Sequence, residues 1–469
     1  MKANKESLGQ KLKRCIKGLL LTAVGVQIVL GLIWLGGSFG STQFFSVSMD
    51  YVQAAENLTF HEYSGILYVL LTAAALWLQQ ITGISYYQPL YIIQVAVFLW
   101  AAYFFVCCMK RSGGTKGKLT AIFGALFLCT VPMLMQCHLA VRPQSLVVSV
   151  FLVMLGLCKR AADNVAEING KLWIVMGTLW MVLSLLLPEY LYLGAVPVTG
   201  LLVLSFLKKG KILKSGCLVL LVFLVVTCML NAAVLKPAAD RIERKFESAM
   251  ISRLVWPWFN QSYYFWPEEI KAVMSPGQAL LIDADAEAVQ RDFGPMVEQA
   301  YGKERALQLY AQMAKASLEV RTKDVLHEIW EDLKAYICTP LGVYGQLRGA
   351  EQISYSGWNY KNMSEQCPQI TRPYVFCGFG LWFAEIFCFA GVVVRRLLLW
   401  KKEGESDKEK THSHAFFWIA GLCVLSQAVW YTMSGAGMMD YLNVPVITVL
   451  WYALPIYLIF TPQRGRDID

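Results

Sequence analysis

Apolar runs of about 20 residues recur along most of this chain. A helical run of that length matches the hydrocarbon core of a bilayer, because an α-helix rises 1.5 Å per residue. Only 16% of the 469 residues are charged, whereas soluble domains keep about 25% so that their surface stays wet. We therefore predict an all-α polytopic membrane protein. We expect its first apolar run, Leu19–Trp34, to be retained, since no small-residue cleavage motif follows it.

Lysine and arginine predict the orientation of these runs, because short cytoplasmic loops are rich in both. More than half of the 42 Lys and Arg residues fall on one side if the run 64–83 lies along the outer interface instead of spanning. All the others except Arg142 lie in one long polar segment, which escapes this rule. We therefore predict about ten transmembrane helices with both termini in the cytoplasm; the alternative is that 64–83 spans and another run does not. The candidate runs are approximately 17–37, 64–83, 87–109, 119–137, 143–158, 172–187, 189–207, 215–235, 373–395, 415–434 and 441–461.

The polar segment divides the chain into three predicted regions. Residues 1–236 form an N-terminal transmembrane bundle with an outer loop at 38–86. Residues 237–372 form an extracytoplasmic, mostly helical domain, because apolar residues within 296–336 recur at helical spacing. Residues 373–469 return to the membrane as C-terminal transmembrane helices.

Features of the polar segment leave alternatives open. Its aromatic stretch at 253–266 suits a lipid–water interface or a groove that binds a sugar or a polyprenyl chain. Cys338 and Cys367 can form a disulfide if the segment is outside the cytoplasm. Asp283 and Asp285 have a spacing that suits a divalent cation, although such pairs are also common in exposed loops. No other cofactor is expected.

Several functional classes are excluded by composition and motifs. The net charge of +9 comes from basic clusters between apolar runs, so it indicates topology and not nucleic-acid binding. The 13 cysteines show no spacing typical of zinc ligands. No glycine-rich phosphate loop, G-x-S-x-G motif or H-E-x-x-H motif occurs. The chain therefore carries no motif of the common soluble enzymes.

The predicted topology places rare ionisable residues at the outer edge of the membrane. They come from different loops. Ionisable side chains at a membrane edge are energetically unfavourable, so their presence indicates that they have partners or functions. Each of them alone has a simpler interpretation as an exposed loop residue. Together they predict a site on the outer face. The ionisable residues there are Asp50, Glu56, His61, Glu62, His138, Arg142, Glu189 and Asp440.

The order of these features resembles the GT-C superfamily of membrane glycosyltransferases, in particular the protein O-mannosyltransferase and aminoarabinose-transferase branch. Members begin with one helix, followed by an outer loop with an acidic motif and helices that lie along the membrane. Here Ser48–Met–Asp50–Tyr51 and Ala54–Ala55–Glu56 match the motif. His138–Leu–Ala–Val–Arg142–Pro–Gln–Ser–Leu146 resembles the outer start of an early bundle helix, and Asp440–Tyr–Leu–Asn–Val–Pro445 resembles a late family pattern.

The resemblance implies transfer of a sugar from a polyprenyl-phosphate donor to a glycan, lipid or protein acceptor. Asp50 would be the general base that takes the proton of the acceptor hydroxyl. Arg142 would bind the leaving phosphate, because a guanidinium can hold it through two hydrogen bonds. His138 would assist Arg142. Glu189 would position Arg142 or contact the acceptor, and Glu56 is counted with the substrate-binding residues.

Two other functions remain open at this point. A transporter or flippase of a lipid-linked substrate would have a similar composition, although no convincing internal repeat is present. An inactive relative or assembly partner is the other alternative. It is suggested by two departures from the family pattern: Tyr51 stands where a second acidic residue is often found, and Asp440 stands where a basic residue is often found.

Overall fold

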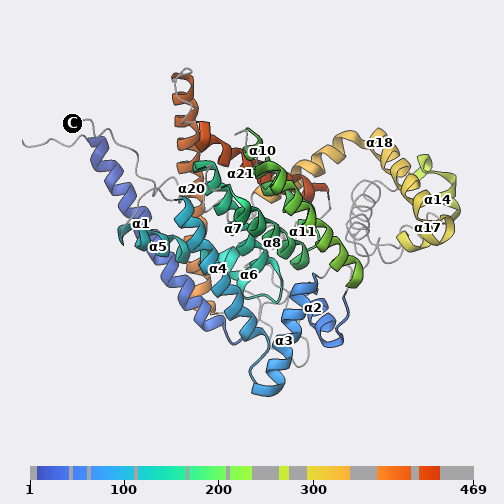
Figure 1. Ribbon diagram of the computed structural model, residues 1–469, viewed down its shortest axis with the longest axis horizontal. Helices are drawn as coiled ribbons and strands as arrows, with labels where there is room; N and C mark the ends of the chain where they lie inside the picture. Colours follow the sequence, from blue (N-terminus) through green and yellow to red (C-terminus); the bar gives the residue numbers. More distant parts are fainter. Residues whose placement is uncertain are drawn as a thin grey trace, which may run out of the picture. The chain divides into compact units, whose positions relative to one another are not determined.

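The computed structural model is helical throughout the part of the chain that it describes, with no strand there. It describes residues 8–41, 46–60, 65–109, 115–164, 168–207, 212–234, 263–273, 293–337, 367–402 and 411–433. The chain forms two compact units (Figure 1), and the division between them falls within helices α11 and α21. The first comprises residues 1–227, 340–424 and 445–469, and the second comprises 228–339 and 425–444.

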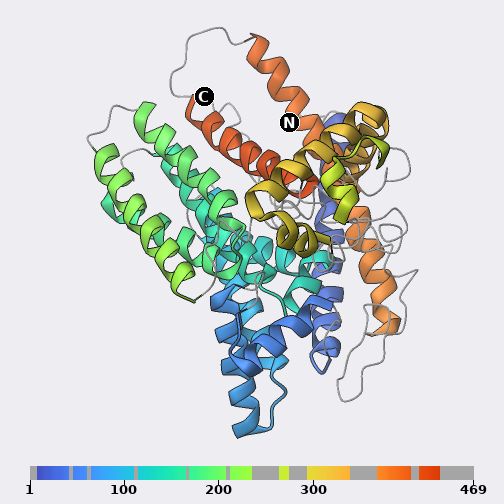
Figure 2. The same cartoon turned by 90° about the vertical axis from the view of Figure 1, so that its right-hand side faces the viewer.

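The first unit is a helical bundle around α4. Helix α4 packs against α5 and α7, and α7 packs in turn against α8 and α10. Helix α1 runs alongside α20, as Figure 2 shows for the dark blue and orange ribbons. The helices that enter this unit are α1 (Leu8–Ser38), α2 (Ser46–Asn57), α3 (Ile66–Thr82), α4 (Tyr87–Met109), α5 (Thr115–Cys129), α6 (Pro132–His138), α7 (Gln144–Asp163), α8 (Gly170–Leu186), α9 (Tyr190–Leu193), α10 (Ala195–Leu207), α11 (Ile212–Val234), α20 (Pro368–Lys402) and α21 (Thr411–Met433).

Three described helices are long and apolar enough to cross a membrane: Gly18–Ser38, Tyr87–Met109 and Gln144–Asp163. Other apolar helices are shorter; one of 17 residues measures about 26 Å, less than the bilayer core of about 30 Å. These shorter helices are Ile66–Thr82, Gly170–Leu186, Tyr190–Phe206, Gly216–Asn231 and Trp418–Trp430. The composition is that of a membrane protein. The count of ten spans and the cytoplasmic termini stay predictions, and the run 441–461 lies outside the described residues.

The run 119–137, which the sequence predicts as one helix, is broken in the structure. Helix α5 ends at Cys129, α6 begins at Pro132, and the two are bent by 76°. Proline has no N–H and disfavours helical geometry in the residue before it. Accordingly, Val131 is extended, with φ −62° and ψ 126°. The pair counts as a fourth span only if the two pieces cross the membrane together.

Two glycines of the bundle make room for aromatic rings of a facing helix. A Cβ at Gly177 of α8 would lie 2.4 Å from the Phe223 ring of α11, and one at Gly216 of α11 would lie 2.6 Å from the Trp173 ring of α8. At two places along the helix pair, a glycine of one helix therefore faces an aromatic ring of the other. Such contacts stabilise helix pairs in lipid, where no hydrophobic force drives apolar surfaces together.

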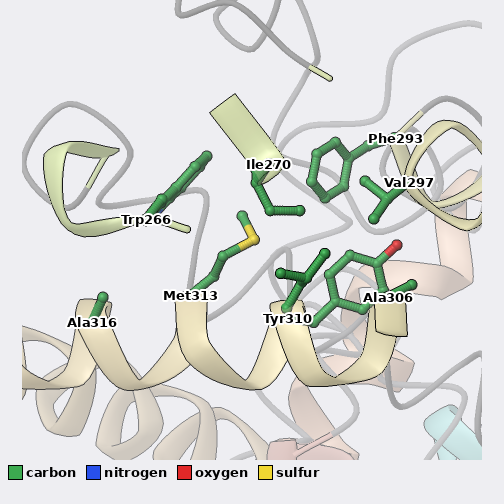
Figure 3. Close-up of a cluster of buried hydrophobic side chains, with 9 residues drawn as sticks. Trp266, Ile270, Phe293, Val297, Ala306, Tyr310, Met313 and Ala316 are labelled. Carbon is green, nitrogen blue, oxygen red and sulfur yellow. The ribbon is translucent and has the colours of Figure 1, made fainter. Parts of the chain in front are cut away.

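The second unit contains a small apolar core of the kind found in soluble helical domains. Its described elements include the 3-10 helix η4 (Tyr263–Phe265) and the α-helices α14 (Glu268–Val273), α17 (Gly294–Tyr301) and α18 (Lys303–Ile337). Helix α18 is kinked at Arg321, where φ is −136° and ψ is 41°. The core, shown in Figure 3, consists of Trp266, Ile270, Phe293, Val297, Ala306, Leu309, Tyr310, Met313 and Ala316.

This core refines the predictions for the polar segment. Helices α17 and α18 occupy the stretch whose spacing predicts helix. Within the aromatic stretch, Trp266 is a core residue, whereas Tyr264 and Phe265 are exposed. The remaining residues 253–262 lie outside the described part of the chain. Cys367 is a free thiol, and its predicted partner Cys338 is not described.

Candidate functional site

The predicted site residues His138 and Arg142 lie on a short connection between α6 and α7. Helix α6 ends at His138, and the Leu139 N–H closes it on the Met135 carbonyl. The Arg142 N–H then donates to the Ala140 carbonyl at 2.9 Å. Proline at position 143 precedes the first turn of α7 and has no N–H to leave unpaired there. We refer to residues 138–143, which comprise the last residue of α6 and the connection to α7, as the Arg142 loop.

His138 is fully buried at the start of this loop. Its ring lies 4.5 Å from the Phe98 ring of α4, measured between centroids. Its Nδ1 lies 2.7 Å from the Ser145 hydroxyl, which can donate or accept according to the tautomer. Its Nε2 has no hydrogen-bond partner among the described residues. The imidazole is therefore anchored on one side and has one nitrogen available on the other.

Gln94, on α4, holds the backbone of the Arg142 loop through two hydrogen bonds. Its Nε2 donates to the His138 carbonyl at 2.8 Å and to the Ala140 carbonyl at 3.1 Å. Its Oε1 accepts a hydrogen bond of 3.2 Å from the Tyr68 hydroxyl of α3. The side chains of Gln94 and Tyr68 are both fully buried. The amide thus uses both of its N–H groups and its carbonyl, and it connects α3 to the loop.

Arg142 itself is almost completely enclosed, with 2% of its surface exposed. Its side chain or backbone has partners in the fold, and its backbone lies beside the Tyr68 hydroxyl. A guanidinium stays charged at any physiological pH and is stable inside a protein only when acceptors surround it. The position therefore suits a group that binds or counterbalances an anion.

Helix α2 carries the predicted base, Asp50, and is attached to the same network. The backbone of Asp50 is helical, but its side chain lies outside what the structure describes. The next residue, Tyr51, is buried, and its ring meets the Tyr68 ring edge-on at 5.1 Å between centroids. Glu56, one and a half turns later, is exposed. Its role in binding a substrate stays a prediction.

Glu189 is half-buried in the turn between α8 and α9, directly after the buried Pro188. The end of α8 lies against the start of α3, because a Cβ at Gly65 would be 1.9 Å from the Leu186 carbonyl oxygen. Glu189 therefore belongs to the end of the bundle where α3 begins. Its pairing with Arg142 stays a prediction.

A metal site is not formed by the described residues, which contain no group of three or more His, Cys, Asp or Glu side chains with suitable geometry. The two residues proposed to hold a divalent cation, Asp283 and Asp285, lie outside the described ranges. Asp440 of the late family-like pattern also lies outside them.

Sequence reasoning missed Gln94, Tyr68 and Ser145. Gln94 carries a signal, because an amide in the middle of an apolar run is costly unless it is paired. Tyr68 and Ser145 stand in stretches on which the family resemblance rests, but neither residue was assigned a role there. Together with Arg142 and His138 they form a polar cluster that suits recognition of an anionic group. Comparison of the chain with family models, with curated proteins and with solved structures found no match.

Proposed function

We propose that this protein is a glycosyltransferase that moves a sugar from a polyprenyl-phosphate donor to an acceptor at the extracytoplasmic face of the membrane. The observation that carries the proposal is the connected network from α2 to the Arg142 loop. Tyr51 contacts Tyr68, Tyr68 bonds to Gln94, and Gln94 bonds to the loop. A helix with a carboxylate and a loop with a guanidinium are thereby joined in one end of the bundle.

The two charged groups have complementary tasks in such a transfer. The Asp50 carboxylate takes the proton of the acceptor hydroxyl, whose oxygen forms the new bond to the anomeric carbon. The bond between that carbon and the phosphate oxygen breaks, and the phosphate leaves with the electron pair. Arg142 stabilises the growing negative charge on the phosphate. The resemblance to GT-C enzymes in the order of these residues supports the assignment.

The membrane topology is part of the proposal. With ten transmembrane helices and both termini in the cytoplasm, α2, the Arg142 loop and Glu189 are all extracytoplasmic. Polyprenyl-phosphate sugars lie in the membrane with their head groups at its surface, so a site at the membrane edge suits the donor. A glycan, a lipid or a protein is the acceptor class in this proposal.

A second candidate function, transport or flipping of a lipid-linked substrate, is favoured by the break between α5 and α6. Broken helices in transporters often surround a substrate or ion site. Here the Thr130 carbonyl at the break accepts hydrogen bonds from Gln27 of α1 and Tyr374 of α20. The same carbonyl is thus satisfied by protein groups, and the break is explained by Pro132. We therefore rank transport second.

Transfer of a radiolabelled sugar from polyprenyl-phosphate donors by the purified protein in nanodiscs tests the first proposal. We expect transfer by the intact protein and its loss in Asp50→Asn. Glu319→Gln, a change in an exposed carboxylate of the second unit, is the matched control and should transfer normally. Transfer that survives Asp50→Asn would refute the assignment of the base. Movement of a fluorescent lipid-linked sugar across vesicles, without transfer, would support the second candidate.

A further inference from the structure

We infer that Gln94 and Tyr68 are positioning residues that hold the Arg142 loop in the conformation that binds the anionic group of the substrate. Neither residue is expected to contact the substrate. The inference rests on the proposed function, in which Arg142 binds the donor phosphate. The inference goes beyond that function because it names the residues that determine where the Arg142 guanidinium lies.

The first argument is the way in which Gln94 grips the loop. Its two amide hydrogens reach carbonyls two residues apart, those of His138 and Ala140, one on each side of Leu139. A single carbonyl contact would leave the loop free to rotate about it, whereas two contacts fix both its position and its direction. Gln94 itself sits on a 23-residue helix that is packed against α5 and α7. The loop is therefore fixed to a helix that is itself held by two neighbouring helices.

The second argument is the orientation of the Gln94 amide. A glutamine amide can flip, and the flipped amide would present its oxygen to the two carbonyl oxygens. The two carbonyl oxygens only accept, so they select the orientation that points the NH₂ group at the loop. The Tyr68 hydroxyl then donates to Oε1, the amide atom left without another partner in that orientation. Tyr68 is fully enclosed, so water does not replace it in this task. Loss of this one hydroxyl should therefore loosen the loop, because the hydroxyl supports the Gln94 amide and lies beside the Arg142 backbone.

The third argument is that the network reaches α2. The Tyr68 ring packs edge-on against Tyr51, the residue that follows Asp50. A shift of Tyr68 is consequently transmitted to the helix that carries the proposed base as well as to the Arg142 loop. In transfer reactions a displacement of about 1 Å between reacting groups lowers the rate by about 100-fold. Such a junction is where a small change would have a large effect on catalysis.

A purely structural role is the competing explanation, and the chain offers a matched control for it. Tyr374 of α20 is as fully buried as Tyr68, and its hydroxyl also makes a buried hydrogen bond, to the Thr130 carbonyl. That hydrogen bond joins α20 to the residue that follows α5, outside the Arg142 loop. Tyr68→Phe and Tyr374→Phe therefore delete the same atom from equally buried rings, but only the first deletion acts on the loop.

The test combines amide hydrogen exchange with sugar transfer in full-length protein held in nanodiscs. For Tyr68→Phe we expect exchange at Leu139–Arg142 to rise about tenfold and kcat/KM for the polyprenyl-phosphate sugar to fall about 100-fold. Tyr374→Phe should change neither quantity, although both variants lower the melting temperature to a similar extent. Gln94→Met, which keeps the volume of the side chain, should repeat the Tyr68→Phe result if the tyrosine variant fails to fold.

The two readouts separate failure of the inference from failure of the proposed function. If exchange in the loop stays at its original rate in both Tyr68→Phe and Gln94→Met, the positioning role is refuted, whatever the transfer assay shows. It is also refuted if transfer falls equally in Tyr68→Phe and Tyr374→Phe. If the intact protein transfers no sugar but the loop loosens selectively, the proposed function fails and the positioning of Arg142 stands.

Discussion

The two compact units both have an apolar core, but they differ in the polar side chains that they bury and the ones that they expose. In the first unit, Gln94 and His138 are fully buried, while Trp100 and Leu218 are 61% and 63% exposed. In the second unit, the fully buried residues include Met313. The side chains of the ion pair Lys315–Glu319, by contrast, are 77% and 67% exposed.

This difference is the one expected of a bundle that lies in lipid and a domain that lies in water. Apolar side chains on the bundle surface are stable in lipid, and its polar side chains are stable only when they find partners inside. In water the hydrophobic effect buries the apolar residues, and charged residues remain hydrated outside. Polar residues of the first unit therefore carry specific contacts between distant segments. In the second unit, charged residues such as Lys315 and Glu319 lie on the surface, so mutations of the same type should act differently in the two units.

The largest difference is expected for arginine-to-lysine changes. Arg142→Lys keeps the charge but loses the planar group that can bind a phosphate through two hydrogen bonds. We expect kcat/KM for sugar transfer to fall about 1000-fold, as for loss of a donor that stabilises a developing anion. Steady-state kinetics in nanodiscs measure this.

The matched change in the second unit is Arg305→Lys. Arg305 pairs with Glu269, and both side chains are about 40% exposed. Surface pairs contribute little to stability and tolerate changes in geometry, so transfer should remain within about twofold of normal. If both variants lose activity equally, the distinction between the units is wrong.

The second prediction concerns the apolar core of the second unit. Met313→Ala removes a fully buried side chain that lies among Trp266, Ile270 and Tyr310 (Figure 3). We expect the opening free energy of α17 and α18 to fall by about 3 kcal/mol, from lost burial and the cavity that remains. Amide hydrogen exchange of the full-length protein measures it. Leu326→Ala in the same helix, where the side chain is 57% exposed, should change it by less than about 0.5 kcal/mol.

The third prediction concerns backbone packing in the first unit. A Cβ at Gly65 would lie 1.9 Å from the Leu186 carbonyl oxygen, so either α3 or α8 must move. We expect Gly65→Ala to destabilise the bundle by about 2 kcal/mol, a typical penalty of overpacking. Gly36→Ala in α1, where no atom lies within 4 Å of the added Cβ, is the control. Thermal unfolding in detergent compares them, and an equal effect of both changes would contradict the close contact.

The positions of the helices could be predicted from the sequence because each apolar run determines its own conformation in lipid. Helix α4 covers the predicted run 87–109, and α8 and α11 begin and end within about three residues of their predicted runs. The break at Pro132 also has a local cause, and its signal was present in the sequence. The number of runs that actually cross the membrane depends on their tilt and neighbours, so it did not follow from length alone.

The candidate site was predictable only in part, because its contacts join distant segments. Arg142 and His138 are ionisable residues at the edge of an apolar run. Such residues are energetically unfavourable there, so the sequence alone identifies them as candidates. The bonds that hold them come from Gln94, 44 and 46 residues away from its two acceptors, and from Tyr68, 26 residues before Gln94. These separations are much longer than the repeat of a helix, so no local sequence pattern predicts the contacts. Which polar residues meet is therefore set by packing of the helices.

The smallest effect is expected from the surface charge of the second unit. Arg305 donates a hydrogen bond to Glu269 and holds the pKa of that carboxyl below its ordinary value. The folded form therefore binds the Glu269 proton less readily than the unfolded form does. The stabilisation is complete above the ordinary carboxyl pKa of about 4.3 and is lost as the pH falls through the lower, folded value. We expect local opening of α14 and α18 to increase on acidification. Glu269→Gln should make this increase smaller. Glu319→Gln, which removes an exposed carboxylate on α18, should leave it unchanged. Hydrogen exchange at neutral and acidic pH, corrected for the intrinsic exchange rate, measures the difference, and an unchanged pH response in Glu269→Gln would show that this pair does not contribute.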